Sequence, residues 1–204
     1  MTAVPTSSVP SRRDIVRSGL IGTAAWVAGT VAIAQQRTIP FLEFGRKQFT
    51  IIQPEREVPS IRLFRLQGGT TDLSSLRGKP ILLNFWATWC AACRTELPIF
   101  ERQLRSAWRD SLHVVAVSED RDSRQAVERF VNSHDLKSLP VYLDPNGYVG
   151  AFGGDNGRHA PFLLYGMPIT YLISASGLII GYMPGEADWS SDAAGDLIEY
   201  LRQS

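Results

Sequence analysis

The most informative part of this sequence is residues 81–93, which read Ile81-Leu82-Leu83-Asn84-Phe85-Trp86-Ala87-Thr88-Trp89-Cys90-Ala91-Ala92-Cys93. The run from Ile81 to Trp86 is nearly continuous in apolar residues, which is typical of a strand buried on both faces of a largely parallel sheet. Beyond Cys93 the apolar spacing changes to three and four residues, at Leu97, Phe100, Leu104 and Ala107. This period indicates an amphipathic helix. The first cysteine, Cys90, is therefore expected at the N-terminus of a helix that follows a buried strand.

The expected position of Cys90 favours its thiolate form. Unpaired backbone N–H groups and the positive end of the helix dipole stabilise an anion at a helix N-terminus. Cysteines placed in this way, above all in a Cys-x-x-Cys motif, have pKa values lowered from ~8.5 to roughly 3.5–7.5. Cys93 lies one turn into the helix, so we expect it to be more buried and able to close a small disulfide ring with Cys90. We interpret Cys90 as an attacking thiol and Cys93 as a resolving thiol.

A structural disulfide and a zinc site are weaker interpretations of the cysteine pair. A structural disulfide normally joins distant segments, whereas a ring between Cys90 and Cys93 restrains little of the unfolded chain. A zinc site needs about four ligands. The sequence has two cysteines, and the only histidines that could complete such a site, at no recognisable ligand spacing, are His113, His134 and His159. We therefore expect a redox pair, with no metal and no other cofactor.

Three segments of the sequence point to one family. They are residues 77–98 around the cysteines, Tyr165-Gly166-Met167-Pro168-Ile169-Thr170, and Gly185-Glu186-Ala187-Asp188-Trp189-Ser190. Over roughly residues 60–204 the sequence resembles the TlpA/ResA-like thioredoxin-fold reductases, and the third segment resembles the TlpA branch. The resemblance implies an α/β, thioredoxin-like fold in which a central mixed β-sheet is flanked by helices.

The resemblance also implies roles for residues outside the cysteine pair. Glu96 matches an acidic residue that the family places one turn beyond the second cysteine. It would transfer protons or tune a cysteine pKa, and the alternative is a solvated glutamate. Pro168 matches the family's cis-proline, which leaves the backbone of the preceding Met167 free to bind an extended substrate segment. Of the two nearby tryptophans, we expect Trp89 at the surface, where it can contact partners, and Trp86 in the core.

Ala92 departs from the family pattern, because many relatives have a proline directly before the second cysteine. Proline has a fixed φ and no backbone N–H. Alanine restores that donor close to Cys90, which should stabilise the thiolate and hence the reduced form of the pair. We therefore expect this pair to be less reducing than the pair of a Cys-x-Pro-Cys relative.

Residues 1–36 have the order of an export signal, with charged, then apolar, then small residues. Arg12 and Arg13 resemble a twin-arginine signal, and the uncharged stretch that follows contains Ala32-Ile33-Ala34, which has the form of a cleavage site. The apolar run is short for the roughly 30 Å of a bilayer core, so one expectation is cleavage after Ala34. The other is an uncleaved N-terminal membrane anchor. Both place the rest of the chain outside the cytoplasmic membrane.

The remaining sequence is expected to comprise a linker or extended lead-in at residues 37–60 and one domain at residues 61–204. The chain is 44% hydrophobic, which suffices for one core, and its net charge of +1 without a basic stripe gives no indication of nucleic-acid binding. Strands are expected near residues 61–66, 112–117, 141–143, 169–173 and 178–182. Helical segments are expected at residues 72–76, 148–152 and 192–202, and after a cap at Asp122 or Ser123.

These features predict a thiol-disulfide oxidoreductase that reduces protein disulfides on the outer face of the cytoplasmic membrane. By resemblance, its substrates would be oxidised cysteine pairs in apocytochrome c or in copper-site assembly proteins of cytochrome oxidase. Electrons would come from a membrane thiol-disulfide donor. The alternative is a copper chaperone on the same fold without reductase turnover, since soft thiolates suit Cu(I). Related copper chaperones use a longer cysteine spacing and a distant histidine, which this sequence does not match.

Overall fold

The computed structural model describes residues 38–40, 42–44, 46–121, 123–153 and 160–204. The segment expected to be an export signal or membrane anchor, residues 1–36, lies outside the described residues, as does the alternative helix cap Asp122. Within the described ranges, no helix has both the length and the apolar character needed to cross a membrane.

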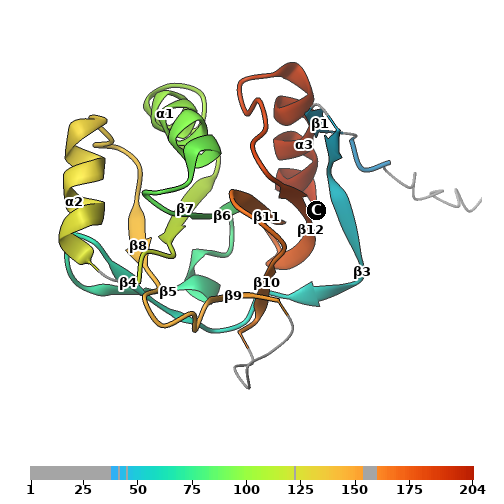
Figure 1. Cartoon of the computed structure of the whole chain (residues 1–204). Helices are drawn as coiled ribbons and strands as arrows, with labels where there is room; N and C mark the ends of the chain where they lie inside the picture. The colour runs from blue at the N-terminus through green and yellow to red at the C-terminus, as the bar shows by residue number, and fades with distance from the viewer. Residues whose placement is uncertain (1–37, 41, 45, 122, 154–159) are drawn as a thin grey trace, which may run out of the picture. The chain divides into compact units, whose positions relative to one another are not determined.

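A mixed sheet of eight strands forms the centre of the described chain, in the order β3-β12-β11-β6-β7-β8-β4-β5 (Figure 1). Strands β6, β7 and β8 run parallel, and the pairings of β6 with β11, β11 with β12, β12 with β3, β8 with β4 and β4 with β5 are antiparallel. The strand bounds are β3 Thr50–Glu57, β4 Arg62–Arg65, β5 Thr70–Asp72, β6 Ile81–Trp86, β7 His113–Ser118, β8 Val141–Leu143, β11 Ile169–Ile173 and β12 Leu178–Pro184. The predicted central strand is thus confirmed as β6, which lies between β11 and β7.

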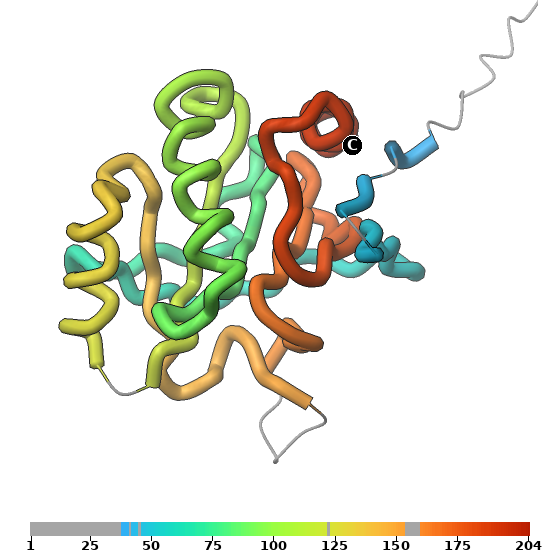
Figure 2. Tube along the Cα trace, turned by 45° about the horizontal axis from the view of Figure 1, so that its top comes forward, coloured from blue at the N-terminus to red at the C-terminus, as the bar shows by residue number. Residues whose placement is uncertain are grey.

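Three helices stand side by side in the described chain, with α1 between α2 and α3 (Figures 1 and 2). Their bounds are α1 Ala91–Arg105, α2 Arg124–Ser133 and α3 Asp192–Gln203, and a short 3₁₀ helix, η1 Leu73–Leu76, precedes β6. Cys90 caps α1, Ser123 caps α2 and Ser191 caps α3, each through its side chain. Helices were expected beyond Cys93, after a cap at Asp122 or Ser123, at residues 192–202 and as a short turn at residues 72–76, and the structure has α1, α2, α3 and η1 there.

Alternate residues of β6 face two different apolar layers. Leu82 and Trp86 pack in the layer that contains the buried faces of all three helices. Leu83 and Phe85 pack in the opposite layer, with Leu73 of η1 and with residues of β10 Phe162–Leu164, a strand outside the main sheet. Because both faces of β6 are covered, every one of its residues is buried, and this explains why its sequence is almost continuously apolar.

The segment expected to be a linker or extended lead-in, residues 37–60, carries strands that pack on the domain. Strands β1 Glu43–Phe44 and β2 Lys47–Gln48 form a small ribbon, and β3 extends the main sheet by pairing with β12. The Phe49 side chain is buried against Gly181, where a Cβ would come within 2.5 Å of the Phe49 ring. The lead-in is therefore extended and forms part of the folded unit that begins at residue 38.

The prediction of a short helix at residues 148–152 is wrong. This segment forms β9 Gly150–Phe152, which pairs in parallel with β10 Phe162–Leu164. Gly150 packs so closely on β6 that a Cβ at this position would lie 2.7 Å from the Phe85 ring. The glycine that interrupts any helical period here is thus required for close packing of the ribbon on the sheet.

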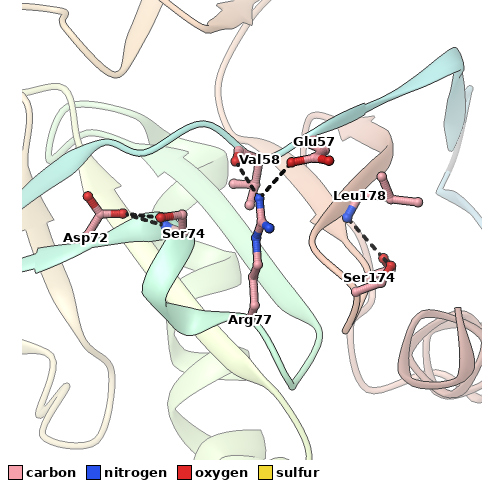
Figure 3. A network of polar contacts seen from close by, with 8 residues as sticks. Glu57, Val58, Asp72, Ser74, Arg77, Ser174 and Leu178 are labelled. Carbon is pink, nitrogen blue, oxygen red and sulfur yellow. Dashed lines mark hydrogen bonds and ion pairs between the residues drawn. The ribbon is translucent and has the colours of Figure 1, made fainter.

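Arg77 fastens the end of the lead-in to the body of the sheet (Figure 3). Its Nη2 donates to the Val58 carbonyl oxygen at 3.3 Å and to the Glu57 carboxylate at 3.2 Å. The stem of Arg77 also lies against Gly177, where a Cβ would approach its Nε to 2.6 Å. An exposed ion pair of this kind contributes roughly 0–1 kcal/mol, so the packing and the backbone contact matter more than the charge.

Candidate active site

Cys90 and Cys93 form a disulfide at the N-terminus of α1. The Cys90 Sγ atom accepts a hydrogen bond from the Cys93 backbone N–H at 3.2 Å. Cys93 is completely buried, whereas Cys90 retains 7% of its exposure. The predicted arrangement of the pair is confirmed, with Cys90 at the helix terminus and the more accessible of the two.

The loop between β6 and Cys90 is held by the end of the neighbouring strand β7. Thr88 donates its backbone N–H and its hydroxyl to the Asp120 carboxylate, at 2.9 and 2.5 Å. Asp120 also accepts from the Ser118 hydroxyl at 2.8 Å. Asp120 thus fixes the segment that presents Cys90. Asp120 was not predicted as part of the site, although acidic residues directly after a buried strand were a visible signal.

The two tryptophans near the cysteines lie in different environments, as predicted. Trp86 is fully buried and its ring lies 5.1 Å from the Phe130 ring of α2. Trp89 is 68% exposed and lines a cavity of about 390 Å³ together with Glu119, Arg121 and Phe152. Trp89 is therefore exposed directly before Cys90 in the chain.

Glu96 is buried one turn beyond Cys93, so the alternative of a solvated glutamate is wrong. Its Oε1 atom accepts from the Trp189 indole N–H at 2.6 Å and from the Ala187 backbone N–H at 3.1 Å. Its Oε2 atom accepts from the Asn84 side-chain amide at 2.9 Å. Burial raises the pKa of Glu96 to about 7, and these three donors, the Trp189 indole first among them, oppose that rise.

The donors around Glu96 come from elements that are far apart in the sequence. Asn84 is the one polar residue of β6, and its amide also donates to the Thr170 hydroxyl of β11 at 2.9 Å. Ala187 and Trp189 belong to residues 185–190, the segment between β12 and α3. These residues were not predicted as part of the site. A lone amide in a strand buried on both faces was the available signal, because such a group needs a partner.

The Met167-Pro168 peptide bond is cis, as the family resemblance implied. Pro168 directly precedes β11, whose Ile169 pairs with Phe85 near the end of β6. The proline therefore lies at the same end of the sheet as the loop that leads to Cys90. Pro168 is buried and Met167 is half-buried, and the Pro168 carbonyl accepts from the Gly185 N–H at 2.6 Å.

A second buried glutamate, Glu119, lies at the end of β7 and was not predicted as part of the site. Its backbone N–H donates to the Trp86 carbonyl at 2.8 Å, and its side chain lines the cavity beside Trp89. Burial, together with the neighbouring Asp144 carboxyl, raises the pKa of Glu119 to about 9. Asp144 itself accepts from three backbone N–H groups, those of Tyr148, Val149 and Gly150.

Across the described ranges, no three His, Cys, Asp or Glu side chains are grouped so as to hold a metal ion.

Residues 54–181 match the AhpC/TSA family. The chain belongs to this family. It is 34% identical over 130 residues to the thioredoxin-like protein YneN of Bacillus subtilis strain 168, covering 63% of this chain and 69% of YneN. It is 28% identical over 148 residues to the thiol-disulfide oxidoreductase ResA of Bacillus cereus strain ATCC 10987, covering 72% of this chain and 76% of ResA.

Solved structures show the same fold at lower identity. A DsbF homologue from Corynebacterium diphtheriae superposes with a TM-score of 0.60 at 19% identity, covering 80% of this chain and 99% of the homologue. A thiol:disulfide interchange protein of the thioredoxin family from Chlorobium tepidum gives 0.57 at 22% identity, covering 74% and 99%. The expected thioredoxin-like fold is thus confirmed. Together with the Cys90–Cys93 disulfide, the family relationship identifies this chain as a thiol-disulfide oxidoreductase.

Proposed function

We propose that this chain reduces protein disulfides outside the cytoplasmic membrane, with Cys90 as nucleophile, Cys93 as resolving thiol and Glu96 as proton acceptor. The observation that carries the proposal is the layout of α1, where Cys90, at 7% the more exposed of the two cysteines, caps the helix and a fully buried Cys93 follows. A buried carboxyl with a pKa of about 7 lies one turn further on. Such a carboxyl exchanges protons readily near neutral pH.

The reaction has two exchange steps. In the reduced protein the Cys90 thiolate attacks one sulfur of a substrate disulfide, so the substrate S–S bond breaks and one substrate sulfur leaves as a thiolate. A mixed disulfide now joins Cys90 to the substrate. Cys93 then gives its proton to the Glu96 carboxylate, and the Cys93 thiolate attacks the Cys90 sulfur. The second substrate thiolate leaves, and two electrons have passed from the cysteine pair to the substrate.

The proposed substrates are oxidised cysteine pairs in apocytochrome c or in copper-site assembly proteins, and the proposed electron donor is a membrane thiol-disulfide protein. Both follow from the resemblance to TlpA/ResA-like reductases, and the export-type sequence of residues 1–36 supports a location outside the cytoplasmic membrane. Trp89, Met167 and Pro168 are the residues we propose to contact the substrate. The high exposure of Trp89 and the position of Pro168 at the active-site end of the sheet support this assignment.

The test is to trap the mixed disulfide. Reduced Cys93→Ser protein should form a stable adduct with insulin, or with exported proteins from the native host, and mass spectrometry should place every adduct on Cys90. Wild type should instead turn over insulin in the presence of dithiothreitol, and Cys90→Ser should do neither. Stoichiometric Cu(I) binding by wild type without insulin reduction would contradict the proposal in favour of the copper chaperone.

A further inference from the structure

The segment Gly185-Glu186-Ala187-Asp188-Trp189-Ser190 carries a side chain that the two exchange steps leave unexplained. Trp189 is 1% exposed, and its ring lies 5.7 Å from the Phe100 ring of α1. Packing alone would be satisfied by a phenylalanine. The indole N–H instead donates to Glu96 at 2.6 Å, across 93 residues of sequence. This is the shortest of the three hydrogen bonds to that carboxyl.

The two oxygens of Glu96 have unequal surroundings. Oε1 accepts two hydrogen bonds from the segment before α3, one from Trp189 and one from Ala187. Oε2 accepts a single bond, from Asn84, whose second amide hydrogen is directed to Thr170. A carboxylate oxygen offers about two lone-pair positions. Oε1 is therefore saturated by donors, whereas Oε2 keeps a position at which a proton can be added.

We propose that Trp189 is a positioning residue for disulfide exchange, whose indole N–H anchors Oε1 of Glu96 and so presents Oε2 as the atom that takes the Cys93 proton. The inference rests on the proton-transfer role of Glu96 in the proposed function. It assigns the Trp189 segment to the chemistry of the cysteine pair, although no residue of this segment is a nucleophile.

Removal of the indole N–H should shift the titration of Glu96 upward. The bond stabilises the carboxylate form, and it is the largest of the effects that oppose the pKa rise caused by burial. Glu186, in the same segment as Trp189, is a charged group that also acts on this carboxyl and raises the pKa of Glu96. Cys93 lies one turn before Glu96 on α1. Asn84, which donates to Glu96 from the sheet, and Thr170, which accepts from Asn84, carry no charge.

The experiment compares Trp189→Phe with Trp108→Phe, a matched control. Trp108 is also buried and its ring lies 5.9 Å from the same Phe100 ring, so both variants lose an indole next to α1. The Glu96 carboxyl is titrated by carbon-13 NMR in the oxidised protein, where the cysteines do not ionise, and its signal is assigned with Glu96→Gln. We expect Trp189→Phe to raise the Glu96 midpoint by about one pH unit. The midpoint of mixed-disulfide resolution should rise in parallel, and Trp108→Phe should leave both midpoints in place.

A second replacement guards against a folding defect. Trp189 replaced by β-(3-benzothienyl)alanine keeps the fused ring but has sulfur in place of the N–H, so it should reproduce the upward shift in a protein that packs like wild type. An unshifted Glu96 midpoint in this protein would overturn the inference. A wild-type protein that fails to reduce insulin would instead contradict the proposed function, and the two failures are read from different measurements.

Discussion

Glu96, one turn beyond Cys93, and Glu119, at the cavity that Trp89 lines, are both buried glutamates, and they differ in what surrounds them. Glu96 receives three N–H donors and its pKa is raised to about 7. Around Glu119, the Asp144 carboxyl adds most to the effect of burial, Arg121 opposes it and Asp120 adds to it, and the pKa of Glu119 is raised to about 9. Burial acts on both in the same direction. The neighbours decide how far each group departs from an ordinary carboxyl.

This difference separates their chemical uses. At neutral pH the Glu119 carboxyl is protonated, so it can donate a hydrogen bond but cannot act as a base that takes up a proton. Glu96 is close to half-ionised at the same pH, which is the condition under which a carboxyl both accepts and returns protons. The donors contributed by Asn84 and by the segment before α3 therefore distinguish a candidate proton acceptor from a structural acid.

The largest effect expected from this comparison is on turnover. Glu96→Gln should lower the rate of disulfide reduction at pH 7 by about 100-fold, because general acid–base groups typically contribute ~10²–10⁴-fold. Glu119→Gln is the matched control and should stay within about twofold of wild type, since an amide can donate as the protonated acid does. The rates are compared in an insulin-reduction assay. Equal losses in the two variants would remove the distinction between the two acids.

The next effect is on stability and concerns Glu119. Because the folded-state pKa is raised from 4.5 to about 9, the folded protein retains a proton that the unfolded chain loses, and folding becomes less favourable as pH rises through this window. Glu119→Gln removes the titration. Its free energy of unfolding relative to wild type should therefore increase by about 2.6 kcal/mol between pH 6 and pH 8.

Urea unfolding of the oxidised proteins at the two pH values measures this gain. Glu96→Gln serves as the comparison: its amide would place N–H hydrogens against those of Asn84 and lose a hydrogen bond at either pH. Because the folded-state pKa of Glu96 is about 7, the free energy of unfolding of Glu96→Gln relative to wild type should rise only about half as much as that of Glu119→Gln over the same pH interval. A constant difference between Glu119→Gln and wild type would show that Glu119 is ionised in the folded state.

The sequence predicted those parts of the fold in which local pattern and burial agree. The continuous apolar run of β6 and the three- and four-residue spacing in α1 placed Cys90 at a helix N-terminus. Strand β3 was missed because six of its eight residues are exposed and it contains Pro54, so no apolar period exists to be recognised. Strand β9 was missed because Gly150 is selected by a contact with Phe85, which lies far away in the sequence.

The candidate site divides in the same way. The cysteines and Glu96 lie within seven residues of one another, so a local motif was sufficient to find them. The hydrogen bonds that tune Glu96 come from Asn84, Ala187 and Trp189, and the separations in sequence are 12, 91 and 93 residues. These donors come together only because β6 pairs with β11 and because the segment before α3 packs against α1.

The smallest effect extends the comparison of N–H donors from carboxylates to the Cys90 sulfur. The donor that contacts this sulfur belongs to Cys93, at 3.2 Å. Ala92 is the second residue of α1, so its N–H is among the first four of the helix, which have no partner within it. Ala92→Pro would leave the Cys93 contact in place and remove one of these nearby unpaired donors.

The thiolate of Cys90, and with it the reduced form, should then be slightly less stable in Ala92→Pro than in wild type. We expect the reduction potential to fall by about 30 mV, which corresponds to ~1.4 kcal/mol for the two-electron couple. Ala92→Ser retains the N–H and should match wild type when all three proteins are equilibrated against glutathione. A potential in Ala92→Pro that equals or exceeds that of Ala92→Ser would mean that the Cys93 N–H alone stabilises the sulfur. In that case the effect of additional N–H donors, which separates Glu96 from Glu119, would not carry over to the cysteine.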